Sequence, residues 1–568
     1  MEFEEALELV GEFGPFQWLL IAYLGLFMVP MHSITMAVHV FTLLEPPHWC
    51  RQPELEEAFN LTPEQARELG APRGPDGEWS GCTMYKLNLT ALGSWTPGKP
   101  LNETWPPRDH IPVVPCQSGW HYDYSLVYPT ILDWVCGETW KTYISHTVFF
   151  GSMSFGVVVF GAFSDIFGRV PITVLVYLLA GLGAVATFFT EDFYMFLGTR
   201  VIVGGVLLAI CTNPFVLVLE YMPAKKRMLM GGVFGFVYPL LGTTLPWVAY
   251  AIGHWRLLNA VILVPALLGT LVSVHVPQVG YVLAEHESPT QLRTSHVNWQ
   301  NKEISCLIIL LRGVCVYLAQ INGKDVESAA IDYLQPPEKS DKATSSVLVV
   351  FKYPALRKSF VITIFIRLIA CLGNQAGQLY AATATTDPFV MSSATNAVDI
   401  VGIWLAVPMA DRFGRRTTAS CAYALASLCY LAAGELYAQR IALMCVLMVG
   451  RILLTISYDV GSVYGAEIDP TEVRTQALSI RQAFGSLGRI LGSHVVQLAM
   501  YGRFLPLYVL GGLSCLAALI TLPLPETKDR KLPETFEEAE AMHHRSAKKD
   551  KDVKKAMIQT PDADCRIN

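Results

Sequence analysis

The chain has 568 residues, of which 52% are apolar and 16% are charged, and its formal net charge is −6. A soluble core cannot bury that much apolar surface, and no basic stripe with interleaved aromatic residues points to nucleic acid, which we exclude as a partner. The composition therefore predicts a membrane protein whose apolar segments face a lipid bilayer.

The first quarter of the chain combines a short lead, one apolar span and a long polar loop. The lead, residues 1–15, is acidic and lacks the charged n-region of a cleavable signal peptide, and the span runs from about Phe16 to Leu44. The loop, residues 45–140, holds three N-x-T sequons and four cysteines, namely Asn60, Asn88, Asn102, Cys50, Cys82, Cys116 and Cys136. Glycan acceptors and an even number of cysteines predict an extracellular loop with two disulfides, for which three pairings are open.

Further apolar runs complete the membrane region. They predict one six-helix bundle within residues 16–276 and a second within 359–524, separated by an intracellular loop at 277–358 and followed by a tail at 525–568. Within the loop, Ile304–Ala319 is expected as an amphipathic or buried helix, because Arg312 would lie at its centre in a membrane. Lys and Arg gather in the connectors opposite the sequons, which predicts a multi-pass plasma-membrane protein with both termini in the cytoplasm.

A duplicated motif relates the two halves. GAFSDIFGR at Gly161–Arg169 is repeated as MADRFGRR at 409–416, and each copy is followed by E-x-x-P-x-x-x-R. A glycine permits close helix packing, an Asp at a helix end can accept hydrogen bonds from a facing helix N-terminus, and each Glu can pair with the Arg of its own motif. We expect a gating cluster that consists of Gly161, Asp165, Gly168, Arg169, Glu220, Arg227, Asp411, Arg412, Gly414, Arg415, Glu467 and Arg474. The alternative for any single arginine is a purely topological charge.

These two loops resemble the signature of the major facilitator superfamily. Other segments are similar to the organic ion transporter family, whose members carry organic cations, organic anions and carnitine-like zwitterions; they are Val10–Gly14 with Gln17, Cys116–Cys136, Trp255–Arg256, Ala466–Thr471, Leu524–Thr527 and Leu532–Thr535. The resemblance implies an all-α major facilitator fold, with twelve transmembrane helices in two six-helix bundles and alternating access around a central cavity. Pro277–Leu283 departs from the family pattern PESPRWL, and the seventh helix lacks the aromatic cluster common in the family.

Ionisable residues inside the spans are candidates for substrate binding, because charge at membrane depth is costly. Asp399 matches an acidic position of relatives in helix eight, and it either binds substrate or pairs with Arg367 or Arg481. At the position of Ser486, relatives that take cations tend to carry Asp and those that take anions tend to carry Arg, whereas here Arg481 and Arg489 flank it. The remaining candidates are the aromatic residues Tyr238 and Tyr458 and the polar residues Gln375 and Gln378.

Two further expectations concern helix ten and the aromatic residues. Arg451 is expected to begin helix ten, where relatives carry Lys or Arg, and an interfacial anchor is the alternative. Tyr238 and Tyr458 are expected to line the cavity, where stacking on an organic cation contributes about 0.5–2 kcal/mol.

The sequence favours transport over catalysis. No Walker loop and no nucleophile–base pair is recognised, and His543–His544 alone does not make a metal site, so we expect no cofactor and no metal. The first hypothesis is a secondary active or facilitative transporter of an organic cation or carnitine-like zwitterion. Its partners would be the lipid bilayer, the small organic ion and a coupling ion or counter-substrate. The alternatives are an organic anion exchanger, favoured by the intramembrane arginines, and a transport-inactive receptor or scaffold.

Overall fold

The computed structural model describes most of the chain outside the central loop and the two ends. The described residues are 14–73, 79–87, 111–124, 134–221, 227–274, 347–384, 387–436, 439–470, 473–528, 533 and 535–542. Within them, the side chains at 165, 219–220, 227–234, 382–384, 440 and 475 are not described. The predicted helix at Ile304–Ala319, most of the loop at 277–358, and the sequons at Asn88 and Asn102 lie outside these residues.

The chain divides into two compact units. Unit 1 comprises Met1–Ala37, Ser145–Pro246 and Ala260–Asn568, and unit 2 comprises Val38–Ile144 and Trp247–Asn259. Unit 1 contains most of the long helices, while unit 2 contains the polar segment that follows the first span together with the adjoining ends of four helical segments.

The amino-terminal half supplies six helical segments. In chain order they are α2 (Pro15–Tyr23), which continues through the π-helix η1 (Leu24–Met28) into α3 (Val29–Thr42), then α6 (Trp140–Phe167), α7 (Arg169–Phe188), α8 (Phe193–Glu220), α9 (Arg227–Ile252), and α10 (Trp255–Ala260) followed by α11 (Leu263–Val274). Apolar residues dominate each segment, and prolines at 214, 239 and 246 are accommodated inside helices, as is common where neighbouring helices cover the backbone.

The carboxyl-terminal half supplies six more. They are α15 (Pro354–Ala384), preceded by the 3₁₀ helix η5 (Val347–Lys352), then α16 (Pro388–Phe413), α17 (Arg415–Glu435), α18 (Arg440–Ile468), α19 (Arg474–Gln497) with the 3₁₀ turn η6 (Leu498–Met500), and α20 (Leu505–Thr521). The seventh helix therefore begins before the predicted residue 359. With these six, the described residues contain the twelve helices that the sequence predicts.

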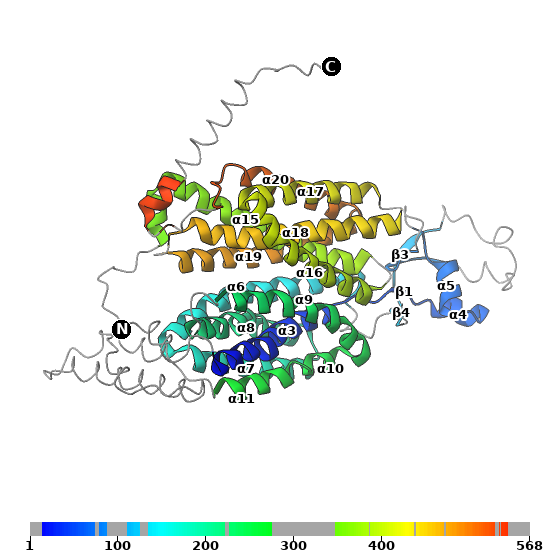
Figure 1. Cartoon of the computed structure of the whole chain (residues 1–568). Helices are drawn as coiled ribbons and strands as arrows, with labels where there is room; N and C mark the ends of the chain where they lie inside the picture. Colours follow the sequence, from blue (N-terminus) through cyan, green and yellow to red (C-terminus); the bar gives the residue numbers. More distant parts are fainter. Residues whose placement is uncertain are drawn as a thin grey trace, which may run out of the picture. The chain divides into compact units, whose positions relative to one another are not determined.

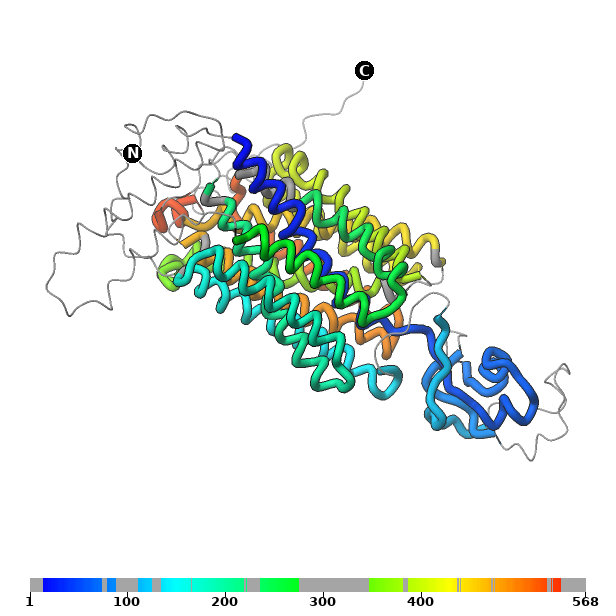
Figure 2. Tube along the Cα trace, turned by 90° about the horizontal axis from the view of Figure 1, so that it is seen from below, coloured from blue at the N-terminus to red at the C-terminus, as the bar shows by residue number. Residues whose placement is uncertain are grey.

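Close helix packing holds the carboxyl-terminal half together. Helix α15 packs on α19, and α17 packs on both α18 and α20. Figures 1 and 2 show the long helices of this half running roughly alongside one another. A Cβ atom at Gly488 of α19 would collide with the backbone of Leu368 in α15, so only glycine permits this approach. The core between these helices is built from buried aromatic and aliphatic side chains such as Tyr423, Tyr430 and Leu454.

The amino-terminal half uses the same principle. Helix α7 packs on α8 and α11, and α6 approaches α8 so closely that a Cβ at Gly156 would overlap the backbone of Gly205. Gly161 was predicted to serve such an approach, but this prediction is wrong, because a Cβ at Gly161 would meet no atom within 4 Å. The close contact is made more than one turn earlier on the same helix.

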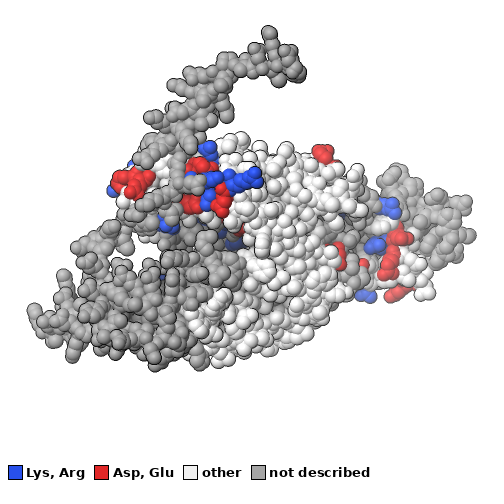
Figure 3. Space-filling view, viewed as in Figure 1, with Lys and Arg blue, Asp and Glu red and all other residues white. Residues whose placement is uncertain are grey.

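Length and composition agree with a membrane location. Eight of the described helical segments are long and apolar enough to cross a bilayer, and α20 is a shorter apolar helix. Helices α15, α17 and α19 are also long but carry more polar side chains, which suits helices that face a bundle interior. Figure 3 shows charged side chains gathered at the helix ends, with helix flanks that are almost free of charge.

Unit 2 is a small two-disulfide domain. It has helices α4 (Pro53–Phe59) and α5 (Pro63–Gly70), the 3₁₀ turn η3 (Cys136–Glu138), and four strands, β1 (His48–Cys50), β2 (Thr83–Tyr85), β3 (Val113–Pro115) and β4 (Trp120–Tyr122). Strand β1 pairs antiparallel with β4, and β2 pairs antiparallel with β3. A segment this polar has little apolar core of its own, so covalent bridges stabilise it.

Candidate functional site

Asp399 of α16 and Arg451 of α18 form a two-pronged ion pair. Arg451 Nη2 donates to Asp399 Oδ2 at 2.6 Å, and Arg451 Nε donates to Asp399 Oδ1 at 2.8 Å. The Thr455 hydroxyl donates to the same Oδ1 at 2.6 Å, and Arg451 Nη1 donates to the Asn374 carbonyl of α15 at 2.7 Å. Both carboxylate oxygens and all three guanidinium nitrogens therefore have partners inside the protein, and the pair joins three helices.

This pairing corrects two interpretations of the sequence. Arg451 does not begin helix ten; α18 starts at Arg440, so Arg451 lies three turns inside it, buried and unable to act as an interfacial anchor. Asp399 pairs with Arg451 and not with the expected Arg367 or Arg481. Sequence spacing cannot reveal such a pair, because its members belong to different helices. The idea that Asp399 contacts substrate remains a prediction.

Arg489 of α19 has no such partner. Its Nη1 atom is buried and unpaired within the described chain, where no carboxylate lies at ion-pair distance from it. The guanidinium lies within electrostatic range of the His32 imidazole of α3 and of the Tyr238 phenol of α9. The His32 and Tyr238 rings contact each other at 5.7 Å between centroids. Two polar rings of the amino-terminal half are thus within electrostatic range of a cation of the carboxyl-terminal half.

Tyr238 is also within electrostatic range of the ion pair. Its phenol is within electrostatic range of Asp399 and Arg451 as well as of Tyr458. We call Tyr238, Asp399, Arg451, Tyr458 and Arg489 the central polar cluster. Three of the candidates that the sequence named, Asp399, Tyr238 and Tyr458, therefore belong to one electrostatic cluster. His32 was not singled out and carried no signal beyond its position in the first span.

Tyr458 is already occupied by an arginine. Arg367 of α15 donates from Nη2 to the Tyr458 hydroxyl at 2.9 Å and to Gln482 Oε1 at 2.7 Å, and its guanidinium carbon lies 4.2 Å from the Tyr458 ring centroid. One face of this ring, which was expected to stack on an organic cation, is therefore covered by a cation of the protein itself. Next to Tyr458, Asp459 has a buried Oδ2 that lacks a partner among the described residues.

The other predicted binding residues are distributed over α15 and α19. Arg481 is buried and bonded to Asp469, the residue that caps the end of α18, and it contacts the Thr363 hydroxyl at 3.4 Å. Ser486 is fully buried and donates to the Gln482 carbonyl at 3.2 Å. Gln375 is buried with an unpaired Nε2, and Gln378 is half-buried. Arg481 is thus neutralised by an aspartate that the sequence interpretation did not name.

The duplicated motif folds in the same way in both halves. Gly168 has φ 92° and ψ 158°, and Gly414 has φ 91° and ψ 158°; each is the residue before a helix, α7 or α17. A non-glycine residue is strained at such a positive φ, so the repeated glycine is explained by the backbone. In the first copy Arg169 Nη1 donates to the Ser164 hydroxyl at 2.7 Å, while the side chains of Asp165, Glu220 and Arg227 lie outside the description.

The second copy lies in an ion-pair network around Arg415. Arg415 Nη2 lies 3.1 Å from Asp411 Oδ1, and Arg415 Nε lies 3.4 Å from Glu467 Oε2. Glu526 accepts the backbone N–H of Arg415 at 2.8 Å, and Thr527 donates to Glu467 at 2.6 Å. We call Asp411, Arg415, Glu467, Glu526 and Thr527 the signature network.

Two expectations for this network are wrong. Glu467 pairs with Arg415 rather than with Arg474, whose Nη2 donates to the Asp469 carbonyl at 3.2 Å. The carboxylate at the N-terminus of α17 belongs to Glu526, whereas Asp411 pairs with Arg415. Glu526 was noticed in the segment Leu524–Thr527 but not as a candidate, because its neighbours come from distant parts of the chain. Arg412 lies beside the network, with its guanidinium over the Phe413 ring.

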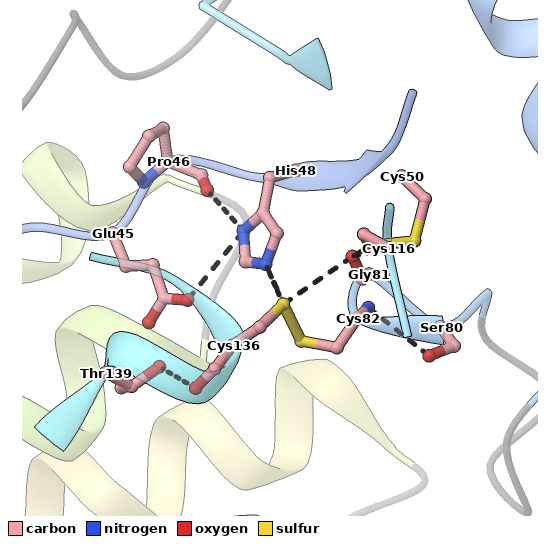
Figure 4. Close-up of polar contacts among 10 residues, drawn as sticks. All are labelled: Glu45, Pro46, His48, Cys50, Ser80, Gly81, Cys82, Cys116, Cys136 and Thr139. Carbon is pink, nitrogen blue, oxygen red and sulfur yellow. Dashed lines mark hydrogen bonds and ion pairs between the residues drawn. A yellow bond between two sulfur atoms is a disulfide. The ribbon is translucent and has the colours of Figure 1, made fainter. Parts of the chain in front are cut away.

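The disulfide pairing that the sequence left open is Cys50 with Cys116 and Cys82 with Cys136. Figure 4 shows the second bridge beside His48, whose Nε2 lies 3.4 Å from Cys136 Sγ and whose Nδ1 donates to the Pro46 carbonyl at 3.1 Å. His48, Cys82 and Cys136 have the spacing of a metal cluster, but the two sulfurs are bonded to each other. Burial lowers the pKa of His48, which keeps its ring neutral at pH 7.

Asn60, the sequon that falls within the described loop, is exposed at the end of α4. The hydroxyl of Thr62, which completes the sequon, accepts the backbone N–H of Gln65 at 3.4 Å and caps α5.

Comparison with known proteins identifies the family. A protein-family model described as "Sugar (and other) transporter" matches residues 123–543, which is most of the chain. The chain belongs to the sugar (and other) transporter family. This assignment makes the protein a membrane transporter and not an enzyme.

Curated relatives of this transporter are organic-ion carriers. It is 28% identical to the "Beta-alanine transporter" of Drosophila melanogaster, over 95% of this chain and 90% of the relative. It is 27% identical to "Organic cation/carnitine transporter 2" of Homo sapiens, with 96% and 95% covered. It is 25% identical to "Organic anion transporter 3" of Homo sapiens, with 99% and 98% covered. The resemblance to the organic ion transporter family is confirmed.

Solved structures confirm the fold of this transporter. The D-xylose–proton symporter matches with a TM-score of 0.51 at 16% identity, over 70% of this chain and 90% of that chain. The xylose symporter bound to 6-bromo-6-deoxy-D-glucose matches with a TM-score of 0.50 at 18% identity, over 72% and 90%. At these identities the likeness shows the major facilitator fold alone.

Proposed function

We propose that this transporter carries a small organic ion with a carboxylate group, and that Arg489 binds the carboxylate. The observation that carries the proposal is the buried, unpaired Nη1 of Arg489 beside His32 and Tyr238. A guanidinium in a low-dielectric site needs an acceptor, and a carboxylate is the acceptor that matches its planar geometry.

A zwitterion is the favoured class of substrate. Asp459 lies next to Tyr458 with a buried, unpaired Oδ2 in the described chain, and it would bind the ammonium group of the substrate. Among the relatives, one is named for β-alanine and another for carnitine, both of which combine a carboxylate with a positive nitrogen. The favoured substrate is therefore a zwitterion, as the sequence suggested, and its negative end binds Arg489.

An organic cation bound by Asp399 is the second candidate. It is supported by the position of Asp399 beside Tyr238 in the central polar cluster. It is less favoured, because a substrate ammonium would have to compete with Arg451 and Thr455 for both carboxylate oxygens. Gln375, Gln378 and Ser486 are proposed as further polar contacts in the same helices. A transport-inactive receptor is the third candidate, and uptake of any substrate would exclude it.

The signature network is proposed as the cytoplasmic latch of alternating access. Arg415 links Asp411 and Glu467, and Glu526 holds the first turn of α17, so rearrangement of this region requires ion pairs to break together. We further propose a plasma-membrane location with cytoplasmic termini, an extracellular and glycosylated loop at 45–140, and a coupling ion or counter-substrate that completes the transport cycle. The lysines and arginines of the connectors support this orientation.

The test is an uptake assay in cells that express the full chain. Labelled β-alanine, carnitine, an aromatic carboxylate and tetraethylammonium are compared for the wild type and for Arg489→Gln. We expect uptake of the carboxylate-bearing substrates, lost in Arg489→Gln at unchanged surface expression and partly restored in Arg489→Lys. Asp459→Asn should reduce zwitterion uptake and spare the aromatic carboxylate.

Arg357→Gln serves as the matched control, because this arginine is exposed at the start of α15. It should leave uptake unchanged. If tetraethylammonium is the transported compound and Arg489→Gln leaves its uptake intact, the carboxylate proposal fails and the assignment to Asp399 takes its place.

A further inference from the structure

A small polar pocket lies inside the carboxyl-terminal bundle. It is lined by α15, α17, α18 and α19, and its free space is small, about enough for one water molecule. Its polar lining consists of Thr363, Arg367, Tyr423, Ser457, Tyr458, Ser462 and Arg481. No carboxylate is among the lining residues.

Two lining groups lack partners. Arg367 Nη1 and the Tyr423 hydroxyl are buried, and neither has a hydrogen-bond partner within the described chain. Tyr423 is 0% exposed, and its phenol is within electrostatic range of the Arg367 guanidinium. Leaving such donors unpaired in a protein interior is costly, so an occupant that accepts hydrogen bonds is expected.

The charge of the pocket selects the occupant. Arg481 is neutralised by Asp469, whereas Arg367 forms its hydrogen bonds with the neutral groups of Tyr458 and Gln482. Asp459 is within electrostatic range of Arg367, but it neither lines the pocket nor bonds to Arg367. A positive charge that is hydrogen-bonded to no carboxylate, with donors around a small space, favours a small monovalent anion over a neutral water molecule.

We infer that this pocket binds a halide ion such as chloride, held by Arg367 Nη1 and the Tyr423 hydroxyl. The site goes beyond the substrate proposal, since it is formed entirely by carboxyl-terminal helices and does not involve Arg489. Chloride would complete the hydrogen bonds of Arg367 and thereby fix Tyr458 and Gln482, which join α15 to α18 and α19.

The test uses the purified full-length protein in detergent and needs no substrate. Its midpoint of thermal unfolding is measured by intrinsic fluorescence in sodium chloride, sodium bromide and sodium gluconate at one ionic strength. A ligand that binds the native state raises the midpoint and saturates. We expect a saturable rise with chloride and bromide but not with gluconate, which is too large for the pocket.

Variants locate the site. Tyr423→Phe should raise the half-saturating chloride concentration about tenfold, because one hydrogen bond to a charged group is lost. Without chloride, the same variant should be at least as stable as the wild type, since it removes an unpaired hydroxyl. Arg367→Gln should abolish the halide effect, and Asp459→Asn should lower the half-saturating concentration by removing a nearby negative charge.

Tyr430→Phe is the matched control, because Tyr430 is another buried phenol of α17 and does not line the pocket. It should leave the halide effect unchanged. Equal midpoints in chloride and gluconate for the wild type would overturn the inference, and so would a chloride effect that Tyr423→Phe does not weaken.

Discussion

Arg451 of α18 and Arg489 of α19 belong to the same half of the transporter, but they differ in whether their charges have partners. Arg451 binds both oxygens of Asp399 and a backbone carbonyl, so its charge is cancelled within the fold. Arg489 keeps a buried nitrogen without a partner in the described residues. Charge at membrane depth therefore stabilises the structure where its partners are complete and is available for a ligand where they are not.

The largest effect on stability is expected from breaking the Asp399–Arg451 ion pair, whose hydrogen bonds are complete. Asp399→Ala leaves Arg451 buried and uncompensated, which costs about 3–5 kcal/mol. We expect low surface expression and a lower thermal unfolding midpoint of the purified protein. Asp399→Leu combined with Arg451→Met should recover most of the loss, because apolar residues of similar size replace a buried pair at little cost. A stable Asp399→Ala protein that has lost only uptake would instead identify Asp399 as a substrate contact.

Removing Arg489, whose hydrogen bonds are incomplete, should lower substrate affinity without lowering stability. Arg489→Gln deletes a half-buried charge that has no carboxylate partner among the described residues, so the unfolding midpoint should stay equal or rise. Substrate affinity should fall by about 1.5–3 kcal/mol, or about 10- to 150-fold, because a charge-assisted hydrogen bond is lost. Unfolding curves and concentration-dependent uptake measure the two effects separately. A marked loss of stability with unchanged affinity would remove the distinction between the two arginines.

The signature network, which lies near the helix ends, tests whether the depth of an interaction in the membrane sets the cost of losing it. Glu526→Gln weakens the acceptor for the Arg415 N–H and the charge at the N-terminus of α17, which together are worth about 1–2 kcal/mol. We expect a modest fall of the unfolding midpoint, smaller than that of Asp399→Ala. Lys528→Gln, a change at a half-buried side chain that donates to the Arg412 carbonyl, is the control. A cost as large as that of Asp399→Ala would show that depth is irrelevant.

The smallest effect on stability is expected from weakening the contacts of Arg367. This arginine has some hydrogen-bond partners, unlike Arg489, but not a complete set, unlike Arg451. Tyr458→Phe removes one of its two side-chain hydrogen bonds but keeps the ring beneath the guanidinium, at a cost of about 0.5–1.5 kcal/mol. The unfolding midpoint at fixed chloride concentration measures this. Tyr458→Leu should cost more, because the stacking contact is lost as well. Equal effects of the two variants would mean that the hydroxyl alone holds Arg367.

Much of the fold could be predicted from the sequence because its signals are local. Apolar run lengths predict the twelve helices, and the repeated Gly168 and Gly414 predict one backbone turn used twice. The sequence predicted that the four loop cysteines would form two disulfides, but it could not choose the pairing. Gly161 shows the limit, because only the position of the neighbouring helix decides which glycine of α6 permits close approach.

By itself, then, the sequence determined the class of the protein: an organic-ion transporter of the major facilitator fold, with a duplicated signature loop and ionisable residues inside its spans. The tertiary structure alone decided which of those residues are already satisfied. It paired Asp399 with Arg451 and Arg481 with Asp469, and it left Arg489 and one nitrogen of Arg367 open. The physical reason is that the hydropathy of a helix depends only on its own consecutive residues. An ion pair depends on the distance between side chains of different helices, which the sequence does not give.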